Sequence, residues 1–416
     1  MVKTVKLDSG VRLVMEKIDY VRSVAIGIWV KAGACDEDKD NAGISHYIEH
    51  MMFKGTANRT AREIAADIDK IGGQINAFTG KEATCYYVKS TSEHYRESAD
   101  VLVDMLTNTL LDPKDMKRER NVIREEIKMN ADDPDDLAHE TVTSLVFKGS
   151  PLGNSILGTY TSLGRISRPV MKNYIEKEYT RDSIVISVAG YFDEKEVTEY
   201  FNDKLLTLTA EKEPKKVEIP EYKPGYRCIT KDIEQTHICM ATKAISLYDD
   251  RYYALSILSN IMGGSMSSRL FQNIREEKGL AYSVYSMNGL FSGDGYFNIY
   301  AGVSHDKVHK AIGAVVEELD ILEKSGVTEE ELDSSREQMK AGNIFSMENV
   351  SGRMFKNGKN TLLSGRVFTE DEVMKGFDGV TLDDIDGIKE LICRPENYSV
   401  AVVTRNSVNV MKMMRG

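Results

Sequence analysis

Apolar and polar residues form two different patterns along this chain, and the two patterns predict strands and helices respectively. Nearly continuous apolar runs of strand length, which predict strands, occur at 24–33, 183–189, 237–245 and 398–404. Segments with apolar residues three or four positions apart, typical of amphipathic helices, occur at 114–129 and 328–343. Strands and helices come in runs rather than in strict alternation. We therefore expect an α+β fold with helices packed on mostly antiparallel sheets.

The two halves of the chain show a similar order of predicted elements, although they share little identity. Three of the eight prolines, Pro214, Pro220 and Pro224, fall among Lys and Glu near the middle of the chain and indicate a linker. This pattern predicts two homologous α+β domains at 1–207 and 227–416, joined by a linker at 208–226.

Composition narrows the classes of function. The 416 residues are 41% hydrophobic and 29% charged, with a formal net charge of −11, which argues against nucleic acid or an anionic membrane as a partner. No run approaches the roughly 18 apolar residues that span a membrane, and the first residues lack the apolar core of a signal peptide. Five scattered cysteines without C-x-x-C spacing indicate reduced thiols. We expect a cytoplasmic protein.

The segment His46-Tyr47-Ile48-Glu49-His50 is the strongest chemical signal in the chain. On a helix, His46 and His50 lie on one face and can reach the same metal ion, with Glu49 on the same side. The order H-x-x-E-H is the inverzincin motif. Catalytic zinc usually has three protein ligands, so the motif predicts another ligand elsewhere in the chain.

The helix expected at 114–129 offers candidates for that ligand. Its expected apolar stripe consists of Val122, Ile123 and Ile127. Glu119 and Glu126 are seven residues apart, almost in line, and border this stripe. A buried carboxylate is costly unless a cation compensates it, and zinc is such a cation. Surface ion pairs with neighbouring arginines are the alternative explanation for the same pattern.

In these residues the chain resembles the pitrilysin / mitochondrial processing peptidase family of zinc metallopeptidases, and in particular its short bacterial-type members. The H-x-x-E-H motif is followed by Glu126, with Glu119 seven residues before it. Residues 72–79 are similar to the family's G-G-x-x-N-A-x-T strand, and residues 263–284 of the second half also match. One departure is a glycine-rich segment reduced to Gly263-Gly264, which bears on processing-type specificity.

The resemblance implies roles for residues of the first half. It makes His46, His50 and Glu126 the ligands of one zinc ion per chain. It makes Glu49 the general base that takes a proton from zinc-bound water, and Glu119 an acid that supports the ligands.

The resemblance also implies how substrate is held. Arg275 and Tyr282 match a pair that reaches into the active site from the far domain. The strand containing Asn76, Ala77 and Phe78 corresponds to the edge that pairs with the peptide.

The function expected from this resemblance is zinc-dependent endopeptidase activity on peptides or unfolded segments. Because the chain has the length of half of a larger family member, we expect a homodimer in which domain 1 faces the partner's domain 2. Two alternatives stay open: the catalytic half of a heterodimeric processing peptidase, and a non-catalytic peptide-binding scaffold.

Overall fold

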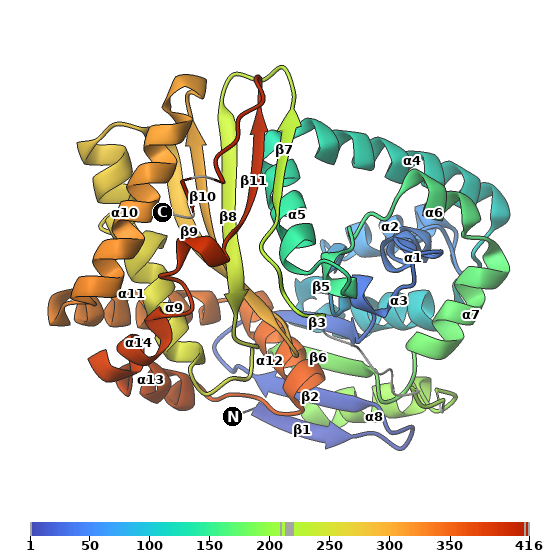
Figure 1. Cartoon of the computed structure of the whole chain (residues 1–416). Helices are drawn as coiled ribbons and strands as arrows, with labels where there is room; N and C mark the ends of the chain where they lie inside the picture. Colours follow the sequence, from blue (N-terminus) through green and yellow to red (C-terminus); the bar gives the residue numbers. More distant parts are fainter. Residues whose placement is uncertain (1, 209, 213–219, 412, 415–416) are drawn as a thin grey trace. The chain divides into compact units, whose positions relative to one another are not determined.

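A computed structural model describes residues 2–208, 210–212, 220–411 and 413–414, and these residues group into two units (Figure 1). Unit 1 comprises Met1–Ile127, Asn154–Val217 and Ile344–Phe368. Unit 2 comprises Lys128–Gly153, Glu218–Asn343 and Thr369–Gly416. Residues 209 and 213–219 of the predicted linker lie outside the described residues.

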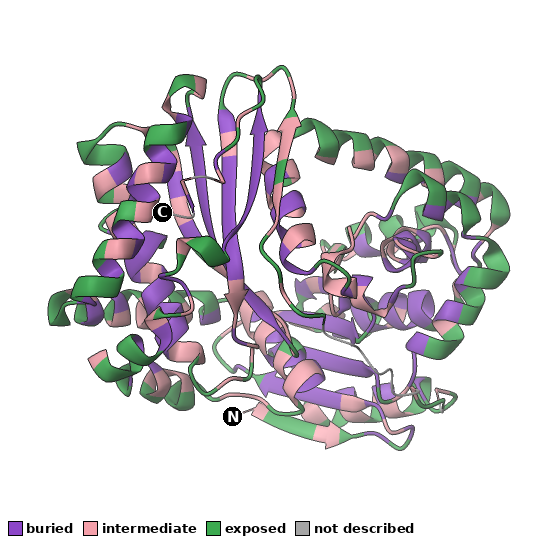
Figure 2. Cartoon of the chain, in the orientation of Figure 1, coloured by how far each residue is buried: buried purple, intermediate pink, exposed green. Residues whose placement is uncertain are grey.

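Unit 1 contains a six-stranded mixed sheet in the order β1-β2-β6-β3-β5-β4. The strands are β1 (Val2–Lys6), β2 (Arg12–Lys17), β3 (Ser23–Val30), β4 (Gln74–Thr79), β5 (Thr84–Thr91) and β6 (Ile184–Gly190). Strands β2 and β6 are parallel, and the other neighbours are antiparallel. The inner strands β3 and β6 are almost entirely buried, whereas the edge strand β1 is not (Figure 2). The other edge strand, β4, also alternates exposed and half-buried residues. The apolar runs at 24–33 and 183–189 therefore belong to central strands.

Unit 2 contains a five-stranded mixed sheet in the order β7-β11-β8-β10-β9. Its strands are β7 (Tyr226–Thr230), β8 (Thr236–Ala244), β9 (Ala281–Leu290), β10 (Gly295–Val303) and β11 (Ser399–Thr404). Only the β7–β11 pair is parallel among these described neighbours. Along β8, Ile238 and Met240 belong to one apolar cluster, while Cys239 and Ala241 belong to another. The strand is apolar at successive positions because both of its faces are covered.

Helices cover both faces of each sheet. In unit 1 they are α1 (Ile44–Met52), α2 (Ala61–Lys70), α3 (Tyr95–Asn108), most of α4 (Pro113–Asp132), α6 (Tyr160–Arg165), α7 (Arg168–Glu178), α8 (Glu194–Lys204) and α12 (Val350–Ser364). In unit 2 they are α5 (Pro134–Val146), α9 (Tyr252–Gly263), α10 (Val308–Ser325), most of α11 (Glu329–Met347), α13 (Glu370–Asp378) and α14 (Leu382–Lys389).

Each sheet receives one covering helix from the other half of the sequence. Helix α12 comes from the second half but packs on β3 and β6 of unit 1. Helix α5 comes from the first half but packs on β8 and β11 of unit 2. The two units are therefore not two uninterrupted stretches of sequence.

The packing of α12 on the first sheet is close and specific. A Cβ atom at Gly358 would lie 2.2 Å from Nε1 of Trp29, so only glycine lets the helix approach the indole ring at this distance. Ser187 Oγ of β6 donates a hydrogen bond to the carbonyl oxygen of Met354 at 2.8 Å. On the same face, Asn357 Nδ2 donates to Glu16 Oε2 of β2 at 2.7 Å. The helix is thus part of the core of unit 1.

The predicted fold class is confirmed: two sheets are covered by helices, with antiparallel pairing between most neighbours. The prediction that α4 buries an apolar stripe was wrong at one residue, Val122. Ile123 is fully buried, but Val122 is 42% exposed, so the buried side of the helix is narrower than predicted. None of the described helices has the combined length and apolar character that a membrane-spanning segment needs.

Candidate metal centre

Helix α1 separates its apolar and polar residues onto two faces. Ile44, Ile48 and Met51 are buried in the core of unit 1. The half-buried residues His46, Glu49 and His50 occupy the other face. The apolar face anchors the helix, so the two imidazoles and the carboxylate are presented together on its open side.

The N-terminus of α1 is capped from a distance by Glu37. Gly43 precedes the helix in the left-handed region, with φ of 88°, and has no side chain to cap it. Glu37 accepts hydrogen bonds from the backbone N–H groups of Gly43 at 2.6 Å and Ser45 at 2.9 Å. Burial raises the pKa of Glu37 to about 7, against the opposing effect of these two donors. The buried carboxylate thus satisfies two amide groups that the helix leaves without partners.

Helix α4 brings the two predicted carboxylates to α1. The hydroxyl of Tyr47 on α1 donates to the carbonyl oxygen of Met116 on α4. Beyond this contact, Ile123 enters the core of unit 1, with Glu119 one turn before it and Glu126 one turn after it. Glu119 is 5% exposed, whereas the side chain of Glu126 is 34% exposed. Both carboxylates therefore lie on the side of α4 that faces α1.

Three candidate ligand atoms converge between the helices. Glu126 Oε2 lies 3.8 Å from His46 Nε2 and 3.5 Å from His50 Nε2. Tetrahedral zinc with bonds of about 2.0–2.1 Å holds its ligand atoms roughly 3.4 Å apart. Glu126 Oε2 is buried and has no hydrogen-bond partner. Among the described residues, these three form the His/Cys/Asp/Glu group whose ligand atoms all lie within 4.8 Å of one another. The set fits a divalent cation such as zinc.

The electrostatic environment keeps one imidazole neutral. Burial, with a smaller contribution from the charge of His50, lowers the pKa of His46 to about 4. A neutral imidazole has a free lone pair for a metal ion, so no proton has to be displaced from His46 near neutral pH.

Glu119 supports His50 from the side away from Glu126. Its Oε2 lies 3.2 Å from His50 Nδ1, and its Oε1 lies 3.0 Å from Lys54 Nζ. A carboxylate that accepts a hydrogen bond from Nδ1–H orients the ring and leaves Nε2 free as a ligand atom. This is the arrangement expected of an acid that supports a metal ligand.

Glu49 lies beside the ligand group without belonging to it. The hydroxyl of Thr79, at the end of β4, donates a hydrogen bond to Glu49 Oε2. Burial raises the pKa of Glu49, and the Thr79 hydrogen bond acts in the opposite direction. The arrangement therefore provides a partly buried carboxylate that could exchange a proton next to the candidate metal ligands.

Comparison with known proteins decides the family. The insulinase (peptidase family M16) model matches residues 12–160, and the model named peptidase M16 inactive domain matches residues 165–339. The uncharacterized zinc protease YmxG of Bacillus subtilis is 40% identical over 97% of this chain and 98% of its own length. This chain belongs to the M16 peptidase family. An uncharacterized zinc protease of Streptomyces coelicolor is 33% identical over 96% of this chain and 89% of that relative.

Solved structures show the same fold. A crystal structure of a peptidase M16 inactive domain from Pseudomonas fluorescens aligns with a TM-score of 0.91 at 18% identity, covering 98% of this chain and 99% of that chain. A protease from Helicobacter pylori aligns with a TM-score of 0.87 at 20% identity, covering 97% and 99%. At these identities the likeness concerns the fold.

In this M16 chain, the predicted pair from the second half lies together in unit 2. Arg275 belongs to a π-helical segment, Phe271–Glu277, and Tyr282 lies near the start of β9. The guanidinium carbon of Arg275 is 4.7 Å from the ring centre of Phe271 and 5.7 Å from that of Tyr282. Tyr282 is 75% exposed. The two aromatic rings therefore hold the Arg275 side chain beside an exposed phenol.

The predicted peptide-binding strand is at an edge of the first sheet. Strand β4 pairs with β5 on one side, and its other side has no strand partner among the described residues. Asn76 and Phe78 are exposed on one face, whereas Ala77 and Thr79 are half-buried on the face nearer α1. The backbone edge is available for an added strand.

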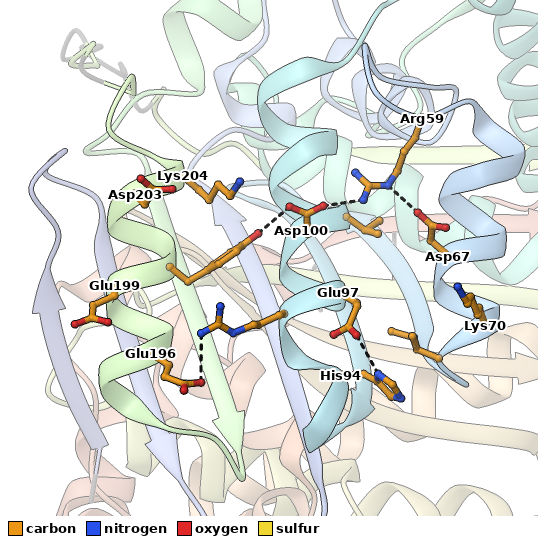
Figure 3. A pocket seen from close by; sticks show the side chains of 14 residues that line it. Arg59, Asp67, Lys70, His94, Glu97, Asp100, Glu196, Glu199, Asp203 and Lys204 are labelled. Carbon is orange, nitrogen blue, oxygen red and sulfur yellow. Dashed lines mark hydrogen bonds and ion pairs between the residues drawn. The ribbon is translucent and has the colours of Figure 1, made fainter.

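Another groove of unit 1, of about 780 Å³, lies between α2, α3 and α8 and is lined by many charged side chains (Figure 3). Its charges largely pair with one another. Arg59 forms ion pairs with Asp67 and Asp100 (Figure 3). It also pairs with Asp104, and Arg96 pairs with Glu196. These pairs join the three helices, so the groove is explained by helix packing.

Three residues of the centre escaped the sequence reasoning: Glu37, Lys54 and Thr79. Thr79 ends the matched G-G-x-x-N-A-x-T strand, and strand alternation places it on the face of Ala77, which was the available signal. Glu37 lies outside the H-x-x-E-H motif, and its hydrogen bonds depend on how the chain loops back to α1. Nothing local distinguishes Lys54 from a surface lysine.

Proposed function

We propose that this M16 chain is a zinc-dependent endopeptidase that hydrolyses peptides or unfolded segments with Glu49 as general base. The observation that supports the proposal most directly is the convergence of His46, His50 and Glu126, with Glu49 beside them. The B. subtilis and S. coelicolor relatives are named zinc proteases, which agrees with this reading.

Each residue of the centre has a distinct part in this proposal. His46, His50 and Glu126 hold one zinc ion per chain. When bound, zinc supplies positive charge that acidifies water and stabilises a developing oxyanion. Glu49 accepts a proton from the attacking water on its carboxylate and later donates it to the leaving amine. Glu119 keeps the His50 ring oriented.

The edge of β4 that faces away from β5 is proposed to bind the substrate as an added strand. Main-chain hydrogen bonds along Asn76, Ala77 and Phe78 would hold an extended peptide with little dependence on its sequence. This mode favours unfolded segments, because a folded substrate has already paired its own backbone groups.

The test is Glu49→Gln, with zinc content and hydrolysis of fluorescein-labelled casein measured on the same samples. We expect zinc to stay bound and hydrolysis to disappear, because the amide cannot accept the proton. Glu125→Gln, on the exposed face of α4, is the matched control and keeps both properties. Activity that survives Glu49→Gln refutes the mechanism. A zinc-loaded wild type that binds casein without cleaving it indicates the peptide-binding scaffold instead.

We further propose a homodimer in which domain 1 of one chain faces the partner's domain 2, so that Arg275 and Tyr282 complete the other chain's site. Their exposure, 41% for the Arg275 side chain and 75% for Tyr282, leaves them accessible to a partner. Analytical ultracentrifugation at micromolar concentration should show a dimer. A purely monomeric, active enzyme rules this out, and activity that requires a second polypeptide indicates the heterodimer. The cytoplasmic location stays a prediction from composition.

A further inference from the structure

The carboxylate of Glu49 accepts a hydrogen bond from a hydroxyl of the sheet. Thr79 Oγ1 donates a hydrogen bond to Glu49 Oε2, and this contact joins the end of β4 to α1. Glu49 is half-buried, and burial penalises its charged form. A hydrogen bond to an ionised carboxylate is among the stronger ones in proteins, so this contact orients one oxygen of Glu49.

The neighbouring groups determine which atom donates. Thr84 of β5 is opposite Thr79 in the register and is fully buried. Its Oγ1 lies 2.9 Å from the carbonyl oxygen of Ala32 and 3.4 Å from Thr79 Oγ1. An ionised carboxylate only accepts hydrogen bonds, so the Thr79 proton goes to Glu49. The Thr84 proton is then directed to Ala32 or to Thr79, and neither arrangement competes for Glu49.

The geometry suits orientation of a base. Threonine is stiff at χ1 because of its branched Cβ, and Thr79 lies on a strand paired through its last residue. The glutamate side chain, by contrast, has three rotatable bonds. A general base is effective when its free oxygen is held within hydrogen-bond reach of the proton it removes. Occupying Oε2 with a fixed donor leaves Oε1 as the oxygen that meets water.

We propose that Thr79 is a positioning residue for Glu49, which ties the general base to the strand that pairs with the peptide. The proposal rests on the proposed function of Glu49. Because Phe78 and Thr79 are adjacent on β4, the backbone that would hold the peptide also sets the position of the hydroxyl. The substrate class that this arrangement serves is an extended peptide added to β4.

The test compares Thr79→Val, which removes the hydroxyl and keeps the shape, with Thr79→Ser, which keeps the hydroxyl. An internally quenched decapeptide that the wild type cuts is the probe. We expect Thr79→Val to lower kcat about 10- to 100-fold, with KM, zinc content and Tm unchanged. We expect Thr79→Ser to restore kcat to within about threefold of wild type, since serine is freer at χ1. Thr4→Val, at an exposed position of β1, is the matched control and keeps wild-type kcat.

Three results would overturn the positioning role. The first is an unchanged kcat in Thr79→Val. The second is a loss of zinc or of Tm in Thr79→Val, which would make the residue structural. The third is a Thr79→Ser variant as slow as Thr79→Val, which would assign the effect to the methyl group. Failure of the proposed function is detected separately, because the wild type would then cut no peptide or Glu49→Gln would stay active.

Discussion

Removing Glu119 should weaken zinc binding without removing a ligand. Its two oxygens contact His50 Nδ1 at 3.2 Å and Lys54 Nζ at 3.0 Å, and the residue is 5% exposed. Without the carboxylate, the Nδ1–H group of His50 loses its acceptor and the ring can rotate. Loss of such a supporting partner typically lowers metal affinity 10- to 100-fold.

Two substitutions of Glu119 should lower the zinc affinity by different amounts. Glu119→Gln keeps an oxygen that can accept from His50 Nδ1 but removes the charge, so we expect a zinc Kd about 10-fold weaker, or ~1.4 kcal/mol. Glu119→Ala removes both the accepting oxygen and the charge, so it should weaken zinc binding by about 100-fold, or ~2.7 kcal/mol. Both variants leave Lys54 without the counter-charge of Glu119.

The assay is competition for zinc with a chromophoric chelator near neutral pH. Glu126→Ala, which deletes a proposed ligand, should lose zinc with the fold retained. It therefore marks the weakest zinc binding expected in this assay. Glu125→Ala, on the exposed face of the same helix, should bind zinc like the wild type. A wild-type Kd in Glu119→Ala would refute the view that Glu119 orients His50. Full zinc occupancy in Glu126→Ala would remove that residue from the ligand set.

Two further predictions concern stability. Gly358→Ala places a Cβ atom 2.2 Å from Trp29 Nε1 and 3.0 Å from Ser187 Cβ, so it should destabilise unit 1 by about 1–3 kcal/mol. Emission of the single tryptophan during urea unfolding measures this, and an unchanged midpoint would contradict it. Burial raises the pKa of Glu37 from an ordinary value near 4.5 to about 7. The folded state then holds this proton more tightly than the unfolded chain, so the free energy of unfolding should fall between about pH 4.5 and 7, by at most about 3 kcal/mol. Glu37→Gln should flatten that decline in a pH series of urea unfolding, and parallel curves for the two proteins would contradict it.

Local patterns in the sequence were enough to predict the helices that carry the candidate metal ligands. An amphipathic helix places residues three and four apart on one face whatever surrounds it, so H-x-x-E-H already implied that His46, Glu49 and His50 share a face. The same spacing argument put Glu119 and Glu126 in line on α4. The apolar run of β3 likewise indicated a strand.

Helix spacing could not tell which carboxylates meet the histidines. Surface ion pairs on α4 explained the same spacing of carboxylates. Val122 is exposed, although its spacing suited the buried stripe. The meeting of α1 and α4 depends on contacts such as Tyr47 to Met116, which join residues 69 positions apart.

What the sequence determined by itself was therefore the face of each helix, the order of strands and helices, and the chemistry that their side chains can support. The tertiary structure alone decided that Glu126 meets both imidazoles, that Thr79 holds Glu49, and that α5 and α12 each cover the other half's sheet. The reason is physical. Periodicity reports only interactions within a few residues, whereas these arrangements arise from packing between segments that are distant in the chain.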